Sequence, residues 1–200
     1  MAINQGADAI GLVGKMPNGP GPIPDWVIAE IARSVQPPVA SFLLTCEQSS
    51  EAVIHHVKRV DTNTVQIVDE ITSGSYSDIR NSLPYLKIVQ VIHITGEESI
   101  DEAIRIAPEV DALLLDSGNP KAVIKTLGGT GFTHNWEISK IIVKKVNVPV
   151  FLAGGLSAQN VRVAIETVQP FGVDICSGVR TEGRLDPYKL ESFIKAVYAV

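Results

Sequence analysis

The chain has 200 residues, of which 45% are hydrophobic and 20% are charged, and its mean hydropathy is +0.19. Such a chain can bury enough apolar surface to fold, which excludes an intrinsically disordered protein. The net charge of −5 without a basic block disfavours nucleic acid and membrane surfaces as partners. Since no apolar run approaches the ~20 residues of a membrane span and no signal-peptide pattern is seen, we expect a cytoplasmic protein that acts on a small molecule.

The predicted strands and helices alternate along the whole chain. Several strands are apolar at consecutive positions, which is typical of parallel strands covered on both faces. The predicted strands are Ala7–Val13, Val39–Leu44, Thr64–Val68, Lys87–Ile94, Asp111–Asp116, Pro149–Ala153 and Gly172–Cys176. Amphipathic stripes of helical period lie between strands, at Val27–Val35, Ile100–Ala107 and Val161–Val168, and after the last strand at Leu190–Val197. Ser99 with Glu102 three residues later reads as a capping box, which places a helix start just after Ser99.

Strict alternation of strands and helices predicts one parallel α/β domain over residues 1–200, because no linker divides the chain. A doubly wound nucleotide-binding sheet is disfavoured, since the glycines of Gly14–Gly21 stand among prolines. The informative glycines follow the last two strands, where β/α barrels build phosphate sites. We therefore predict a TIM-type β/α barrel with about seven visible parallel strands, one short of eight.

Glycine-bearing turns follow both of these strands. Gly154 and Gly155 end one strand, and Ser177 and Gly178 end the other. Glycine at such a turn either supplies unusual dihedral angles or lets backbone N–H groups approach a phosphate. Because the two turns are neighbours in a barrel, the pair favours one shared phosphate site.

Two aspartates stand at the ends of strands. Asp116 closes the run Asp111-Ala-Leu-Leu-Leu-Asp116, so it either faces the mouth of the barrel as a general acid or caps the following turn. Asp174 is expected to face inward on the last strand, on the same side as Cys176, and to contact the substrate. We expect Cys176 to fill the core.

A glycine-rich loop, Leu127–Trp136, contains Gly129 and His134 and is expected to close over a ligand. His134 is either a base or simply solvated, and solvation is the commoner role of a loop histidine. Cys46 reaches the same mouth, as a thiol acid or base or as a filler. No cysteine or histidine spacing suits a metal, and we expect none.

These segments, in this order, resemble the phosphoribosylanthranilate isomerase family of tryptophan biosynthesis. The shared motifs are Gly6–Leu12, Asp111–Asp116, Gly128–Gly131 with Trp136, Leu152–Leu156 with Asn160-Val161, and Gly172–Asp174 with Ser177–Val179. The resemblance implies a cofactor-free acid/base Amadori rearrangement of N-(5-phosphoribosyl)anthranilate to the aminoketose. It implies Asp116 as the acid that protonates the ribose ring oxygen and Asp174 as a residue that orients the substrate. It assigns the phosphate to Gly154, Gly155, Ser177 and Gly178, and further substrate binding to Gly129.

The chain departs from the family pattern in three places. The family begins with a strand carrying Lys-x-Cys-Gly, whose cysteine is the base, and this chain starts at Met1, inside the expected first helix. The family's arginine for the anthranilate carboxylate has no counterpart in Gly19–Ile23, and its Leu-His-Gly-Asp is Ile67-Val-Asp69 here. We expect an N-terminally truncated barrel with impaired turnover; the alternative is a sugar-phosphate-binding barrel with altered or lost catalysis. Unpaired outer strands would also invite a second copy, as a homodimer.

Overall fold

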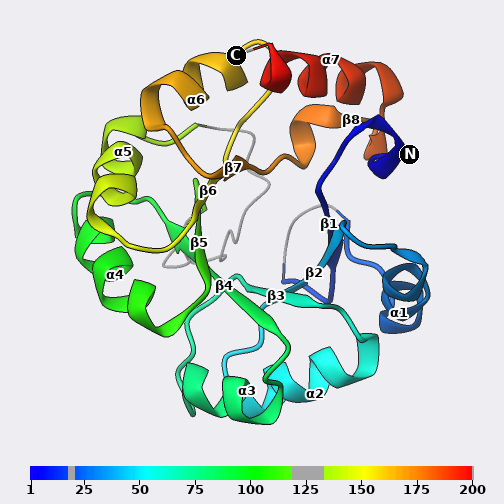
Figure 1. Ribbon diagram of the computed structural model, residues 1–200, viewed down its shortest axis with the longest axis vertical. Helices are drawn as coiled ribbons and strands as arrows, with labels where there is room; N and C mark the ends of the chain where they lie inside the picture. Colours follow the sequence, from blue (N-terminus) through cyan, green and yellow to red (C-terminus); the bar gives the residue numbers. More distant parts are fainter. Residues whose placement is uncertain (18–20, 119–132, 200) are drawn as a thin grey trace.

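Seven parallel strands form one curled sheet in which each strand pairs with the next along the chain (Figure 1). The computed structural model describes residues 1–17, 21–118 and 133–199. The strands are β1 (Ala9–Val13), β2 (Ala40–Thr45), β3 (Thr64–Ile67), β4 (Lys87–His93), β5 (Ala112–Asp116), β6 (Val150–Leu152) and β7 (Gly172–Val173). A short antiparallel hairpin, β8 (Arg180–Thr181) with β9 (Arg184–Leu185), follows them.

Helices cover the outside of the curled sheet (Figure 1). The α-helices are α1 (Asp25–Ser34), α2 (Ser50–Val60), α3 (Tyr76–Ser82), α4 (Glu98–Ile106), α5 (Trp136–Lys145), α6 (Val161–Val168) and α7 (Pro187–Tyr198). Three short 3₁₀ helices are η1 (Ile3–Gln5), η2 (Ala107–Glu109) and η3 (Ser177–Val179). In the described part of the chain no helix is long and apolar enough to cross a membrane.

Side chains of successive strand residues divide between two apolar clusters. Val89 and Val91 of β4 belong to a small inner cluster, whereas Ile88 and Ile92 of the same strand belong to the large outer cluster under the helices. This alternation is the period of two that a strand imposes on its side chains. Both faces of the strands are therefore apolar, which explains the continuous apolar runs in the sequence.

The sheet curls like a barrel but does not close. β1 and β7 stand at the two ends of the strand order and do not pair with each other. Outside the sheet the chain does meet itself, because the Gln5 side chain donates to the carbonyl of Pro187 and the Tyr198 hydroxyl to that of Gly6. The prediction of an incomplete β/α barrel of seven parallel strands is confirmed.

Most predicted strand boundaries agree with the structure to within two residues, and three details differ. The last strand ends at Val173 instead of Cys176, and the β8–β9 hairpin was not predicted. The predicted capping box at Ser99 is wrong, because α4 begins at Glu98, one residue before Ser99. The Ser99 hydroxyl instead donates to the carbonyl of His93. The serine closes the turn between β4 and α4 from inside the helix.

Candidate active site

Asp116 is the last residue of β5 and is 9% exposed. It lies an even number of residues from Ala112 and Leu114 of the inner cluster, so its side chain points into the barrel. One carboxylate oxygen, Oδ1, accepts a hydrogen bond from the backbone N–H of Ser117 at 2.7 Å. The sequence left two positions open for Asp116, a cap of the following turn or a group at the mouth of the barrel. In the structure the carboxylate does both: it caps the turn and faces the mouth.

The turn after β6 packs directly against this carboxylate. Gly154 and Gly155 have φ angles of +81° and +62°, and a Cβ on Gly154 would lie 3.0 Å from Oδ1 of Asp116. Positive φ and close approach are the two conditions that favour glycine. Asn160 holds the turn, since its Nδ2 donates to the carbonyl of Gly155 at 2.9 Å and its Oδ1 accepts from the N–H of Ser157 at 2.8 Å.

The turn that follows β7 touches the turn that follows β6. A Cβ on Gly178, in η3, would overlap the carbonyl oxygen of Leu156. The two turns and both aspartates line one cavity of about 30 Å³, formed by Asp116, Ala153, Gly154, Gly155, Leu156, Asp174, Ile175, Cys176 and Ser177. This volume is about that of one or two water molecules, so a phosphorylated sugar would extend from it into the open mouth.

Asp174 lies just beyond the last strand of the sheet. The expectation that Asp174 and Cys176 share a strand face is wrong, because the strand ends at Val173. Burial among the strand ends, and to a lesser degree the negative charge of Asp116, raise the pKa of Asp174 to about 6. The residue also meets solvent at the mouth. Asp174 therefore retains its proton up to about pH 6.

His134 precedes α5 and is half-buried rather than solvated. Its Nε2 lies 2.7 Å from the hydroxyl of Ser139. Burial lowers the pKa of His134, and the nearby negative charge of Asp116 partly offsets this effect. The imidazole is therefore within electrostatic reach of the carboxylate. Gly129, predicted from the same loop, lies outside the described residues.

His93 is a neighbour of Asp116 that the sequence analysis missed. It ends β4, pairs in register with Asp116, and points inward like Val91 two residues before it. The side chain is 7% exposed. Its Nε2 donates to the carbonyl of Val68 at 2.9 Å, while its buried Nδ1 has no hydrogen-bond partner in the part of the chain that the structure describes. His93 is identified as a neighbour by the register of β4 with β5, which cannot be read directly from the sequence.

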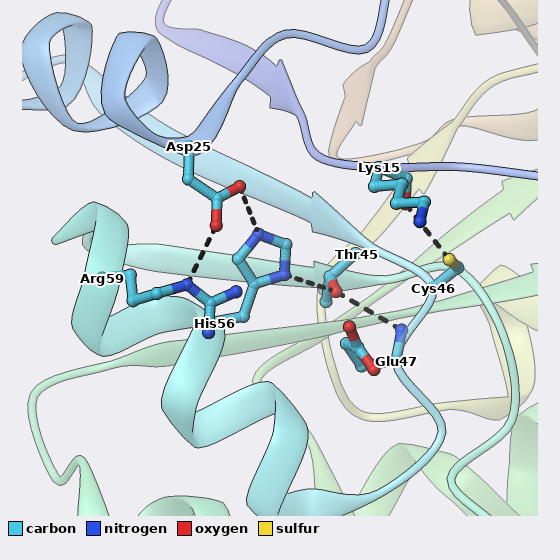
Figure 2. Close-up of polar contacts among 7 residues, drawn as sticks. All are labelled: Lys15, Asp25, Thr45, Cys46, Glu47, His56 and Arg59. Atoms are coloured by element: carbon cyan, nitrogen blue, oxygen red, sulfur yellow. Dashed lines mark hydrogen bonds and ion pairs between the residues drawn. The ribbon is translucent and has the colours of Figure 1, made fainter.

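A polar network holds the loops that follow β1 and β2 (Figure 2). His56 of α2 lies 3.0 Å from the hydroxyl of Thr45 through Nδ1 and 3.2 Å from Asp25 through Nε2. Asp25 also accepts from Arg59 at 2.9 Å, and a Cβ on Gly14 would lie 2.7 Å from the imidazole. The network therefore ties the start of α1 and the C-terminal half of α2 to the end of β2.

Cys46 follows β2 and packs against the inner cluster. Its thiol donates to the carbonyl of Lys15 at 3.3 Å (Figure 2). Both cysteines, Cys46 and Cys176, are half-buried. Among the described residues no group of three or more His, Cys, Asp or Glu side chains is placed to hold a metal ion.

An open parallel β/α barrel with carboxylates and glycine turns at the carboxyl ends of its strands has the architecture of enzymes that act on phosphorylated small molecules. The family model of N-(5'-phosphoribosyl)anthranilate (PRA) isomerase matches residues 26–196. The chain belongs to the PRA isomerase family. This confirms the resemblance inferred from the sequence motifs.

Individual relatives agree with this assignment. N-(5'-phosphoribosyl)anthranilate isomerase 2 of Methanosarcina mazei is 36% identical over 199 residues, which cover 97% of this chain and 86% of that protein. The isomerase of Halobacterium salinarum is 36% identical over 200 residues, 96% of this chain and 87% of that protein. The crystal structure of phosphoribosyl anthranilate isomerase from Thermotoga maritima superposes with a TM-score of 0.82 at 26% identity, covering 100% of this chain and 92% of that one.

Proposed function

We propose that this chain isomerises N-(5'-phosphoribosyl)anthranilate by acid/base catalysis. The observation that carries the proposal is the single cavity shared by two aspartates and two contacting glycine turns. A similar fold has been solved with a bound phosphorylated ligand: a PRA isomerase in complex with reduced 1-(o-carboxyphenylamino)-1-deoxyribulose 5-phosphate has a TM-score of 0.79 to this chain at 24% identity, covering 100% of this chain and 91% of that one.

Each group in the cavity suits one part of this reaction. The glycine turns, with Gly154, Gly155, Ser177 and Gly178, would hold the phosphate through backbone N–H groups. Asp116 would give a proton to the ribose ring oxygen as the ring opens, and Cys46 or His134 would take the proton that the ribose C2 then loses. Asp174 would orient the substrate, and its raised pKa of about 6 lets it donate a hydrogen bond to the substrate below that pH.

The experiment combines ligand binding with turnover. Calorimetric titration of the 200-residue chain with the reduced deoxyribulose 5-phosphate compound measures the anion site, and steady-state turnover of N-(5'-phosphoribosyl)anthranilate measures the chemistry. Gly155→Val should weaken binding at least about 10-fold by blocking backbone approach to the phosphate. Gly183→Val is the matched control, because Gly183 also has a positive φ, +76°, but lies in the exposed β8–β9 hairpin.

Three results would separate the candidate functions. Binding with turnover, both impaired by Gly155→Val and neither by the control, supports the isomerase. Binding without turnover supports a sugar-phosphate-binding barrel. Equal loss in both glycine variants, or no binding at all, contradicts the proposed site.

We propose further that the chain forms homodimers in the cytoplasm. Support for the dimer is the pair of unpaired strand edges at β1 and β7, which invite pairing with a second chain. A solved structure with a TM-score of 0.78 to this chain at 22% identity shows monomers generated from the dimeric isomerase of Thermotoga maritima. Sedimentation analysis at micromolar concentration tests this, and a monomer throughout would contradict it. Support for the cytoplasm is the low cysteine content, two residues in 200, because disulfide-rich chains are typical of oxidising compartments.

A further inference from the structure

Arg180 lies at the mouth of the barrel, in the opening between the two unpaired strands. It follows η3 and begins the β8–β9 hairpin. One guanidinium nitrogen, Nη1, donates to the carbonyl of Gly183 at 2.8 Å. The other, Nη2, lies 3.6 Å from the position of a Cβ on Gly21, in the loop that follows β1. The side chain thus reaches from the loop after the last strand to the loop after the first.

The guanidinium lies above the interior of the barrel. The same Cβ position on Gly21 is 3.7 Å from Cγ2 of Val13, the last residue of β1. Val13 is two residues from Gly11, whose own Cβ would lie 3.2 Å from Leu44 of the inner cluster. Because alternate residues of a strand share a face, Val13 also points inward. Arg180 is therefore placed over the inward face of β1 at its mouth end.

The charge of Arg180 lacks an acidic partner within the described part of the chain. Three other arginines in that part form ion pairs: Arg59 with Asp25, Arg80 with Asp111 and Arg162 with Glu166. Among the described residues, the buried Nε atom of Arg180 has no hydrogen-bond partner. A buried donor without an acceptor is costly to the free protein, and such a group calls for an explanation in a ligand or an ion.

The family's substrate carries two anionic groups, a phosphate on the ribose and a carboxylate on the anthranilate ring. Arg180 does not line the cavity formed by the two glycine turns, which we assign to the phosphate. It lies instead toward the loop after β1, and the chain has no arginine before Arg33. A planar guanidinium matches a carboxylate through two parallel hydrogen bonds.

We infer that Arg180 binds the anthranilate carboxylate and so selects substrates that bear it. The inference rests on the proposed function, since it concerns the second anionic group of the same substrate. On this assignment the substrate lies across the mouth, from the glycine turns after β6 and β7 to the loop after β1.

A pair of ligands tests the inference without requiring turnover. One is reduced 1-(o-carboxyphenylamino)-1-deoxyribulose 5-phosphate, and the other is the same compound without its carboxyl group. Arg180→Met should weaken binding of the first compound by about 10–100-fold in calorimetric titrations, the range of hydrogen bonds to charged groups, and leave the second unchanged. Arg180→Lys should lose less, because it keeps the charge and loses the planar fork. Arg184→Met, an exposed position of the same hairpin, should change neither affinity.

The pattern of losses decides between interpretations. Equal weakening of both compounds by Arg180→Met would show that the side chain serves the phosphate or the hairpin, and would overturn the inference. Unchanged binding of both compounds would overturn it as well. Failure of the unaltered chain to bind either compound would overturn the proposed function and, with it, this inference.

Discussion

The two ends of the open sheet are held together in different ways. At the β7 end, the contacts are made by the backbone: the two turns after β6 and β7, one of which carries positive-φ glycines, contact each other, and the turn after β6 contacts the carboxylate of Asp116. At the β1 end, the contacts are made by side chains: His56 bridges the hydroxyl of Thr45 in β2 and the carboxylate of Asp25 in α1 (Figure 2). Backbone turns leave N–H groups for a ligand, whereas the side-chain network is largely satisfied within the protein. The first end is therefore built for binding and chemistry, and the second for support.

The largest expected effect comes from the carboxylate at the binding end. Asp116→Asn should reduce turnover of N-(5'-phosphoribosyl)anthranilate by about 10²–10⁴-fold, the usual contribution of a general acid, with little change in ligand affinity. Steady-state kinetics and calorimetry measure the two quantities separately. Asp111→Asn is the control, because Asp111 stands at the other end of the same strand in ion pairs with Lys87 and Arg80. Equal rate losses in both variants would contradict a catalytic role for Asp116.

The next effect concerns stability at the supporting end. His56→Ala should lower the free energy of unfolding by about 2–4 kcal/mol, because it opens a cavity and removes one buried hydrogen-bond partner each from Thr45 and Asp25. Urea denaturation measures this change. His55→Ala is the matched control, since the His55 side chain is 66% exposed and lies 3.8 Å from Glu51; it should cost less than about 0.5 kcal/mol. Similar losses in the two variants would remove the distinction between the two ends.

The smallest effect is a pH dependence at the binding end. The pKa of Asp174 is about 6 in the folded chain and about 3.9 in an unfolded one. Between these values the folded state binds more protons, so the contribution of Asp174 to stability falls as pH rises and is lowest above pH 6. Asp174→Asn removes this penalty and should become progressively more stabilising from pH 4 to pH 7. Thermal unfolding at several pH values checks this, and a pH-independent effect would contradict it.

The two ends of the sheet differ in how much of their structure could be predicted from the sequence, because one depends on local patterns and the other on long-range contacts. Asp116, the glycine turns and the strand boundaries follow from local patterns: apolar runs, turn residues and their order along the chain. Two predicted boundaries were wrong: the last strand ends at Val173 instead of Cys176, and α4 begins one residue before Ser99 instead of just after it.

The side-chain contacts were not predictable in this way. Asp25 and His56 are 31 residues apart, and Gly21 and Arg180 are 159 residues apart, so only the curl of the sheet brings them together. His93 became a neighbour of Asp116 through strand register, which a sequence specifies only indirectly. The half-buried position of His134 likewise depends on packing of α5 against the sheet, to which no local pattern points.

The strand order has a consequence for how the chain folds. Because every strand of the sheet pairs with its neighbour in the sequence, the chain can add one β/α unit at a time, and each addition closes a loop of only one unit. Loop closure becomes more costly with length, and domains dominated by local contacts fold faster. The contacts of Gln5 with Pro187 and of Tyr198 with Gly6 join the two ends of the chain. Because their sequence separations are so long, their loop-closure cost is high. The strand order thus confines long-range closure to the contacts between the two ends of the chain, outside the sheet.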